Sequence, residues 1–451
     1  MGTLMSSISG IRGIVGDGLD PQTIVKYVNA YAEFIKKGKV VIGRDSRISG
    51  EMVKTLTTGT LIANGIEVVD IGICPTPTVQ YNVKELKASG GISISASHNP
   101  NQWNALKLLN NTGQFLSPEE YKEMLSILDS SQNNFKKWDE LGKTIEYSEG
   151  LKNHINAILN LDVINISEIK NKKFRVVLDC VNGAGSVCVP EYLENLGCDV
   201  IKVNCDTNGI LVDHPEPLPE NIKGTIHKVM EEKADLGIVV DPDVDRLVLI
   251  TDKGEPFIEE NTITQAVKYI LSKRAGNVVV NLSTTRAVDD VADKFGATVY
   301  RSPVGEANVV KKMKEVDAVI GGEGSGGVIY PSLHYGRDAL FAIAITLQHL
   351  TEFGESISKL KESLPQYFII KKKIEIKTDA DKLLNGIITK FKNAKINTED
   401  GVRVDFEDHW VHLRKSNTEP IIRIITEAKS KEEAESYSAI YLDMLKGLEV
   451  D

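Results

Sequence analysis

A strand–helix–strand pattern occurs three times along this chain and limits the folds that it can adopt. The first copy runs from KVVIGR to IEVVDIG within 39–72, and the second from FRVVLDC to CDVIKV within 174–203. The third, within 277–322, joins NVVVNL, TVYRS and AVIGG through two helical runs. Strands rich in β-branched residues that alternate with helices ending in glycine predict α/β layers in each copy.

The last part of the chain has a different pattern. After the alternating stretch FIIKKKIEIK come short strands near VRVDF, WVHL and IIRIIT, and then a helix. Ser430 and Glu433 have the spacing of a capping box at the start of that helix. We therefore predict an α/β protein of four domains, three similar α/β layered units plus a small C-terminal α+β domain. Polar stretches between the patterns place the predicted domains at 1–148, 149–250, 251–366 and 367–451.

Composition excludes several classes of partner. The chain of 451 residues carries a formal charge of −10, which argues against a nucleic-acid-binding protein. No signal peptide and no apolar run of membrane-spanning length is found, so no membrane partner is expected. The five cysteines include no C-x-x-C pair, which predicts reduced thiols and a cytoplasmic location. An anionic ligand would need local clusters of basic residues.

Three serines alternate with apolar residues in GGISISASHNP. Ser93, Ser95 and Ser97 occupy every second position, which is typical of one face of a strand, and Asn99-Pro100 then forms a turn signal. We expect Ser93 and Ser95 to form the polar side of the strand, and Ser97 to lie where the strand ends. No G-x-S-x-G motif occurs in the chain, so a serine hydrolase built on that elbow is excluded.

Three aspartates follow an apolar strand in DLGIVVDPDVDRL. Asp241, Asp243 and Asp245 stand at alternate positions, so their carboxylates can converge on one hard cation such as Mg²⁺ or Ca²⁺. An EF-hand does not fit, because Arg246 takes the place of its invariant glycine and Asp252 that of its final glutamate. The alternative is a solvated acidic turn.

A glycine-rich stretch, GGEGSGG at 321–327, contains a formal G-x-G-x-x-G. A dinucleotide site would need a helix after it, whereas the strand-like VIYP follows, and Glu323 would repel a pyrophosphate. The stretch favours a loop that offers Glu323 and Ser325 to a polyhydroxylated ligand, and the alternative is a plain glycine turn.

Basic residues gather in RKSNTEPIIRI. Guanidinium groups together with short hydroxyl and amide donors suit a phosphate dianion. The alternative is an exposed loop with an ion pair to Glu419. The candidate phosphate-binding residues are Arg414, Ser416, Asn417, Thr418 and Arg423.

Four motifs in a fixed order, SASHNP, DPDVDR, GGEGSGG and RKSNTEP, resemble those of the α-D-phosphohexomutase family. SGIRG, GRDSR, VVLDCVNGAG and VGEANV also match, so that the resemblance covers essentially the whole chain. It implies four domains around a central cleft, with one motif from each domain.

The resemblance also implies a mechanism. Ser97 would be phosphorylated in the resting enzyme and would pass its phosphoryl group to a hexose phosphate, through a hexose 1,6-bisphosphate. Mg²⁺ would be held by Ser97 and the three aspartates, and Glu323 and Ser325 would bind sugar hydroxyls. The residues around the transferred phosphoryl group would be Arg12, His98, Lys107 and Arg246.

One departure from the family pattern concerns proton transfer. Many members have a histidine at the position of Gly327, so another residue must supply general acid–base chemistry. Lys107 is the first hypothesis, because a desolvated lysine shifts its pKa readily, and Arg12 and His334 are the other candidates.

The leading hypothesis is a mutase that moves phosphate between C1 and C6 of glucose or mannose phosphate, acting as a monomer or homodimer. Phosphoglucosamine mutase is the alternative within the class. A Mg²⁺-dependent sugar phosphatase would lose the phosphoryl group to water, and a non-catalytic sugar-phosphate-binding protein would not need Ser97 beside three aspartates.

Overall fold

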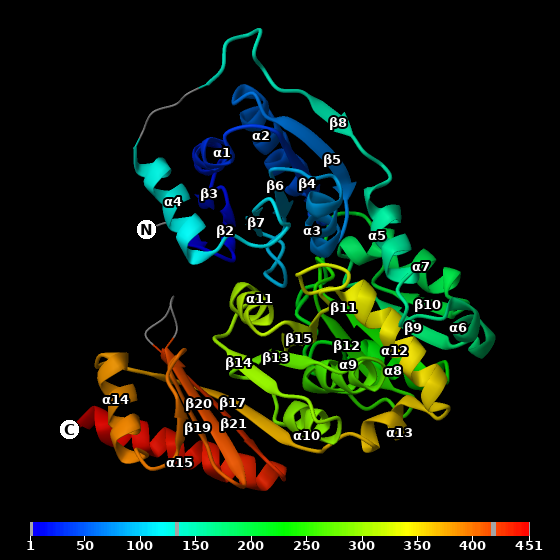
Figure 1. Ribbon diagram of the computed structural model, residues 1–451, viewed down its shortest axis with the longest axis vertical. Helices are drawn as coiled ribbons and strands as arrows, with labels where there is room; N and C mark the ends of the chain where they lie inside the picture. The colour runs from blue at the N-terminus through cyan, green and yellow to red at the C-terminus, as the bar shows by residue number, and fades with distance from the viewer. Residues whose placement is uncertain (1–2, 131–134, 416–420, 451) are drawn as a thin grey trace.

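The computed structural model describes residues 3–130, 135–415 and 421–450, and these form four consecutive domains, each built on its own sheet (Figure 1). The described sheets contain eight, four, four and five strands in chain order. The first three domains combine helices with mixed sheets that are parallel at their centre, whereas the fourth sheet is antiparallel. The predicted class, three α/β units followed by a small α+β domain, is confirmed.

The same four-strand arrangement recurs in the first three sheets. A first strand lies between two parallel neighbours, the second and third strands of the unit, and a fourth strand pairs antiparallel with the third. In the first domain these are β4 (Lys39–Arg44), β5 (Glu67–Ile73), β6 (Gly90–Ile94) and β7 (Trp103–Leu109). In the second they are β9 (Arg175–Asp179), β10 (Asp199–Val203), β11 (Leu236–Val240) and β12 (Leu247–Thr251). In the third they are β13 (Asn277–Asn281), β14 (Val299–Ser302), β15 (Ala318–Glu323) and β16 (Gly327–Ile329).

The remaining elements complete each domain. The first adds β1 (Met5–Ser7), β2 (Gly10–Val15), β3 (Gly18–Leu19), β8 (Thr144–Glu146), α1 (Pro21–Ile35), α2 (Gly50–Ala63), α3 (Thr76–Glu85) and α4 (Pro118–Asp129). The second adds α5 (Gly150–Leu159), α6 (Ile166–Lys172), the short 3₁₀ helix η1 (Ala184–Val187), α7 (Val189–Asn195) and α8 (Lys223–Glu231). The third adds α9 (Glu259–Lys273), α10 (Ala287–Lys294), α11 (Glu306–Glu315), α12 (Ala339–Phe353) and α13 (Ile357–Glu362).

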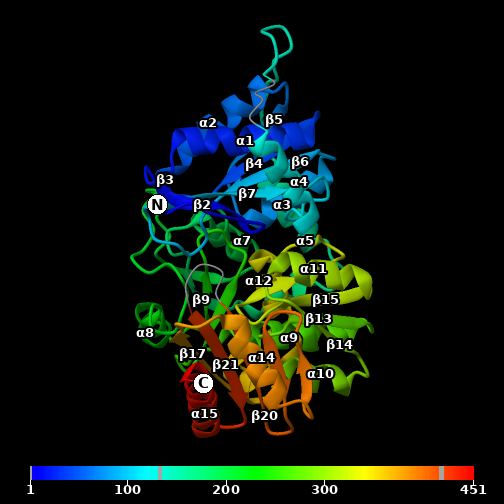
Figure 2. The same cartoon turned by 90° about the vertical axis from the view of Figure 1, so that its left-hand side faces the viewer.

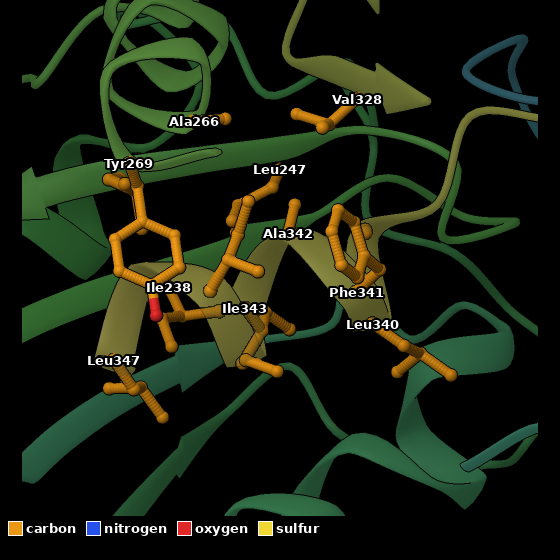
Figure 3. Close-up of a cluster of buried hydrophobic side chains, with 14 of the residues drawn as sticks. Ile238, Leu247, Ala266, Tyr269, Val328, Leu340, Phe341, Ala342, Ile343 and Leu347 are labelled. Atoms are coloured by element: carbon orange, nitrogen blue, oxygen red, sulfur yellow. The ribbon is translucent and has the colours of Figure 1, made fainter. Parts of the chain in front are cut away.

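Helix α12 joins the cores of the second and third domains. Its sequence, ALFAIAITLQHLTEF, is apolar around most of its circumference, as expected for a helix enclosed by other elements. Figure 3 shows Phe341 and Ile343 in the same cluster as Ile238 of β11 and Tyr269 of α9. One continuous cluster of buried residues therefore spans these two domains, whereas the first and fourth have clusters of their own.

The fourth domain is a five-stranded sheet with two helices packed on it (Figure 2). Its elements are β17 (Phe368–Glu375), α14 (Ala380–Lys390), β18 (Lys395–Asn397), β19 (Val402–Asp405), β20 (His409–Lys415), β21 (Ile421–Ala428) and α15 (Lys431–Val450). The capping box predicted for the last helix is present, since the Glu433 amide donates to Ser430 Oγ and the Ser430 amide to Glu433 Oε2.

Two sequence-based expectations can be compared with the structure directly. All five cysteines are free thiols, as predicted. Within the described ranges, none of the helices combines the length and the apolar character that a membrane crossing requires.

Candidate active site

The three sequence motifs of the α/β domains occupy the same place in the repeated unit. Ser97 lies in the loop between β6 and β7, the aspartates lie between β11 and β12, and Ser325 lies between β15 and β16. Each of these loops joins the third strand of its unit to the antiparallel fourth. The sequence folds this way because each third strand is an apolar run that stops at polar or glycine residues, which favour a turn.

Backbone contacts fix Ser97 in an unusual conformation. Its φ is +50°, in the left-handed region that residues other than glycine rarely adopt. The Ser97 amide donates to Ser95 Oγ at 3.0 Å, and the Arg47 guanidinium donates to the Ser97 carbonyl at 2.7 Å. Ser97 Oγ lies 3.2 Å from Asp241 Oδ2. A hydroxyl held at a strained turn beside a carboxylate is the arrangement of a functional site.

Ser93 and Ser95 do not form a solvated face. Both are buried, and Ser93 Oγ is hydrogen-bonded to Thr76 Oγ1 at 2.8 Å. β6 is buried on both sides because strands flank it and helices cover the sheet. Ser93 and Ser95 are polar residues of the strand, as predicted, but their hydroxyl groups form hydrogen bonds with other groups of the protein.

The three aspartates converge as the sequence predicts. Asp241, Asp243 and Asp245 are fully buried, and one carboxylate oxygen from each lies within 4.8 Å of the others. Asp241 Oδ1 accepts from the amides of Asp245 and Arg246, each at 3.1 Å, which folds the loop around this carboxylate. Burial and the neighbouring carboxylates raise the pKa of Asp241 well above its usual value.

The donor set fits a hard divalent cation. Asp243 Oδ1 and Asp245 Oδ1 are buried and have no hydrogen-bond partner among the described residues. Arg246 Nε lies 3.6 Å from Asp245 Oδ1, which is an ion pair but not a hydrogen bond. Buried carboxylate oxygens without hydrogen bonds are costly, and a cation bound to oxygen ligands would compensate them. The strands on both sides of the loop agree with the exclusion of an EF-hand.

Cationic side chains surround this acidic group. Lys107 on β7 reaches Asp243 Oδ2 at 2.5 Å and Asp245 Oδ2 at 3.9 Å. Arg12 on β2 donates to Asn99 Oδ1 at 2.7 Å. The Lys107 contacts bring a positive group of the first domain against the aspartate loop of the second, whereas the Arg12 contact is to the loop that carries Ser97.

His98 is uncharged near neutral pH. Burial, reinforced by the guanidinium groups of Arg246 and Arg12, lowers the pKa of His98 to about 3. The neutral imidazole lies 3.5 Å from Ser97 Oγ, measured from Nδ1. It can therefore exchange hydrogen bonds with the serine but carries no positive charge at pH 7.

Glu323 is held in one orientation at the end of β15. Its Oε1 accepts from Asn281 Nδ2 and the Gly305 amide, each at 2.9 Å, and its Oε2 accepts from Arg337 at 2.6 Å. Burial acts to raise the pKa of Glu323, but Arg337 and these donors outweigh it, so that the pKa lies below its usual value. Glu323 is therefore ionised and preorganised.

The fourth domain contributes Arg414 and Arg423, which face each other across β20 and β21. Arg414 is also paired with Asp400, with 3.3 Å between Nη2 and Oδ2. The other predicted phosphate-binding residues, Ser416, Asn417 and Thr418, lie outside the described residues.

A cleft of about 690 Å³ brings the four domains together. Of the predicted site residues that the structure describes, it is lined by Arg12, Ser97, His98, Lys107, Arg246, Glu323, Ser325, Arg414 and Arg423. The three aspartates lie buried behind this lining, with Asp241 in contact with Ser97. The structure thus has a cleft between the four domains, as the resemblance implies, and these predicted residues are among those that line it.

Several lining residues escaped the sequence analysis. Glu260, Glu306, Arg337 and Lys371 all line the cleft. The segment SLHYGRD drew attention to His334, but His334 does not line the cleft and its Nε2 is 3.0 Å from Asp338 Oδ2. The residue of that segment that lines the cleft is the buried Arg337. Its importance follows from its contacts, which the sequence alone does not show.

Fold and site together define an α/β enzyme that handles phosphorylated sugars at a four-domain cleft. Phosphoglucomutase/phosphomannomutase family models match nearly the whole chain: the α/β/α domains I, II and III match residues 6–135, 152–254 and 260–368, and the C-terminal domain matches 371–443. The chain belongs to this family of α-D-phosphohexomutases and is a phosphohexomutase.

Individual relatives agree with this assignment. A phosphoglucomutase/phosphomannomutase of Thermococcus kodakarensis is 35% identical, with 99% of each chain covered. A probable phosphoglucosamine mutase of Methanopyrus kandleri is 33% identical, with 97% of each covered. A crystal structure of a phosphoglucomutase/phosphomannomutase family protein from Burkholderia thailandensis has the same fold, with a TM-score of 0.87, 24% identity and 98% of each chain covered.

Proposed function

We propose that this phosphohexomutase moves phosphate between C1 and C6 of glucose or mannose phosphate, with Ser97 as the phosphoryl carrier. The observation that supports it most strongly is the position of Ser97 Oγ, 3.2 Å from Asp241 Oδ2, in contact with the loop where Asp243 Oδ1 and Asp245 Oδ1 have no hydrogen-bond partner among the described residues. Asp241, Asp243, Asp245 and the phosphorylated Ser97 would hold Mg²⁺, which would offset the negative charge of the phosphoryl group when bound.

The proposed reaction has two transfers. In the first, a sugar hydroxyl oxygen attacks the phosphorus on Ser97, the bond to Ser97 Oγ breaks, and the hydroxyl proton passes to a base. The resulting hexose 1,6-bisphosphate turns in the cleft. Ser97 Oγ then attacks the phosphorus of the other phosphate, the bond between that phosphorus and the sugar oxygen breaks, and the freed sugar oxygen takes the proton back from the base. Because phosphoryl transfer depends mainly on positioning and charge, Ser97 needs no catalytic triad.

Two groups of cations suit the two phosphates of this intermediate. Arg12, Lys107 and Arg246 line the cleft near Ser97, and Arg414 and Arg423 line it from the fourth domain. Between them, Glu323 and Ser325 would accept and donate hydrogen bonds to sugar hydroxyls. This separation supports a mutase over a phosphatase, which has no need to retain a bisphosphate.

Lys107 is our proposed general acid–base residue. It is buried, lines the cleft and is the basic side chain nearest to Asp243. Replacing it by methionine is expected to lower kcat by about 10²–10⁴-fold, the usual contribution of general acid–base catalysis. Near-normal turnover in Lys107→Met, measured with the coupled assay below, would exclude this role.

The substrate assignment is tested with three substrates in a coupled assay. Mannose, glucose and glucosamine phosphates are each supplied with Mg²⁺ and the corresponding catalytic bisphosphate, and isomerisation and free phosphate are measured. Preference for glucosamine phosphate would favour the phosphoglucosamine mutase alternative, which the Methanopyrus kandleri relative supports. Phosphate release without isomerisation would favour a phosphatase.

Three further expectations belong to this proposal. We place the domain limits at 1–148, 149–250, 251–366 and 367–451, and we expect a monomer or homodimer. The free thiols support a cytoplasmic location.

A further inference from the structure

Arg337, which no sequence motif singled out, contacts three carboxylates from three separate segments. Its Nη2 lies 2.5 Å from Asp245 Oδ2, its Nη1 lies 2.6 Å from Glu323 Oε2, and its Nε lies 3.1 Å from Glu306 Oε2. The side chain is 11% exposed and lines the cleft. One guanidinium group therefore bridges the aspartate loop of the second domain and the sugar loop of the third.

Gly327 makes room for this arginine. A Cβ atom at position 327 would lie 2.3 Å from Arg337 Cδ and 2.9 Å from Arg337 Cγ. The aliphatic stem of Arg337 thus fills the space that any side chain at position 327 would occupy. Gly327 pairs directly with Glu323 in the β15–β16 hairpin, so the stem lies against the strand that carries its own partner.

The backbone of Arg337 is also fixed on both sides. Its amide donates to Glu306 Oε2 at 3.3 Å. The next residue, Asp338, caps α12 through Oδ1 and has His154 Nε2 and His334 Nε2 at 2.8 and 3.0 Å from Oδ2. The helix cap and these two histidines hold Asp338, and so fix the backbone next to Arg337.

Arg337 takes one oxygen of Asp245 and leaves the other turned to Arg246, whose Nε lies 3.6 Å from Asp245 Oδ1. Arg337 occupies Asp245 Oδ2, whereas Asp245 Oδ1 is buried without a hydrogen-bond partner in the described part of the chain. On Glu323 the arginine occupies Oε2, opposite the two donors to Oε1. These contacts hold the carboxylates of Asp245 and Glu323 each in one orientation relative to the cleft.

We propose that Arg337 is a positioning residue that sets the aspartate loop and the sugar loop in one fixed relation, and that Gly327 is required for it. This inference rests on the proposed function, in which the first loop holds Mg²⁺ and the second binds sugar hydroxyls. It couples the two sites: a change at Arg337 weakens both metal binding and sugar-phosphate binding.

Arg337→Lys is the decisive variant, because it keeps the charge but replaces the planar fork by a single ammonium group. Mn²⁺ binding is measured by electron paramagnetic resonance without substrate, and glucose 6-phosphate binding by calorimetry in a Ser97→Ala background. We expect Mn²⁺ affinity to fall about 10–100-fold, as for other residues that orient metal ligands, and sugar-phosphate affinity to fall about 10-fold. Arg274→Lys is the matched control, since Arg274 bonds Ser332 and Asp162.

Gly327→Ala provides a second variant, in which residue 337 is still arginine. The added methyl group displaces the Arg337 stem, so both affinities are expected to fall as in Arg337→Lys. In an Arg337→Ala background the obstacle is gone, and Gly327→Ala should cause no further loss of either affinity. Such non-additivity identifies residues that act through one contact.

The outcomes separate this inference from the proposed function. If Arg337→Lys keeps both affinities, or lowers only the melting temperature, Arg337 is a structural residue and the inference is overturned. Additive losses in Gly327→Ala and Arg337→Ala would overturn the part concerning Gly327. If instead the unmodified chain isomerises none of the three hexose phosphates, the proposed function fails, whatever the variants do.

Discussion

Ser97 differs from Ser93 and Ser95 in its backbone and not in its exposure. All three serines are buried, but Ser97 alone among them has a positive φ, at the point where β6 ends. The strain is compensated locally, because Ser95 Oγ and Arg47 bind the amide and carbonyl of Ser97. A positive φ aims the hydroxyl at Asp241 instead of along the strand.

Substitutions at the three serines should therefore give graded losses of activity. Ser97→Ala is expected to lower kcat by at least about 10³-fold, as the loss of a covalent carrier does. Ser95→Ala is expected to cost about 10-fold, because it leaves the buried Ser97 amide without its acceptor. Ser93→Ala should lower kcat less than Ser95→Ala does. The kcat of all three variants is measured in the coupled assay. Turnover by Ser97→Ala comparable to that of Ser95→Ala would contradict the assignment.

Glu260 gives the fold a pH dependence of its own. Burial raises the pKa of this carboxyl to about 8, against the opposing effect of Lys371 and the Thr285 amide, with the carboxylates of Glu259 and Glu427 adding to the rise. Because the folded pKa lies above that of the unfolded chain, stability falls as the pH rises from about 5 to 8. One such group changes the free energy of unfolding by up to about 1.4 kcal/mol per pH unit.

Glu260→Gln keeps the acceptor for the Thr285 amide and removes the titration. We expect the free energy of urea unfolding to depend less on pH in this variant between pH 5 and 8. The matched control is Glu259→Gln, the neighbouring carboxyl on the same helix turn. An identical pH profile for Glu260→Gln and the unmodified chain would show that Glu260 does not carry the effect.

At the scale of single elements, periodicity and glycine positions predict the strands and helices of the repeated pattern, but not others such as α12. KVVIGR, FRVVLDC and NVVVNL became β4, β9 and β13, and the capping box of α15 formed. Arg337 could not be predicted in the same way. Its partners are 14, 31 and 92 residues away in the chain, so its role depends on how three loops meet after folding.

The cap of α12 combines two functions in one carboxylate. Asp338 Oδ1 accepts the amides of Leu340 and Phe341, and Oδ2 binds two buried imidazoles. Asp338→Ala is expected to lower the free energy of unfolding by about 2–4 kcal/mol, as the sum of a lost cap and unsatisfied buried groups.

Ser356→Ala serves as the comparison, since Ser356 caps α13 only through the Lys359 amide, at 3.4 Å. Ser356→Ala is expected to lower the free energy of unfolding by about 0.5 kcal/mol, the lower end of the range for the loss of an N-cap residue. Both values come from urea unfolding followed by circular dichroism. Equal costs for Asp338→Ala and Ser356→Ala would mean that the imidazole contacts contribute nothing to stability.

Across the whole molecule, stability is unevenly distributed. The second and third domains share one core through α12, whereas the fourth relies on its own smaller cluster beneath α14 and α15. Local opening therefore requires less free energy in the fourth domain than in the joined pair.

Hydrogen exchange can measure this difference. Amides of β20 and β21 are expected to exchange faster than those of β11 and β15 in the unliganded enzyme. Glucose 1,6-bisphosphate at about 100 times its Kd should protect the β20 and β21 amides by up to about 2.7 kcal/mol, because the proposed function has it bind Arg414 and Arg423 from the cleft. Equal exchange in the two regions, or no ligand-dependent protection, would contradict this account.

The recurring strand order has a consequence for how such an enzyme can diversify. Three units present the same hairpin loop to the cleft, one with the serine, one with the aspartates and one with Glu323 and Ser325. Duplication of one ancestral unit, followed by separate specialisation of each copy, produces such an arrangement. Under the proposed function, selection can then alter the sugar that is recognised through changes in the β15–β16 hairpin, while the two copies proposed to carry the phosphoryl chemistry stay unchanged.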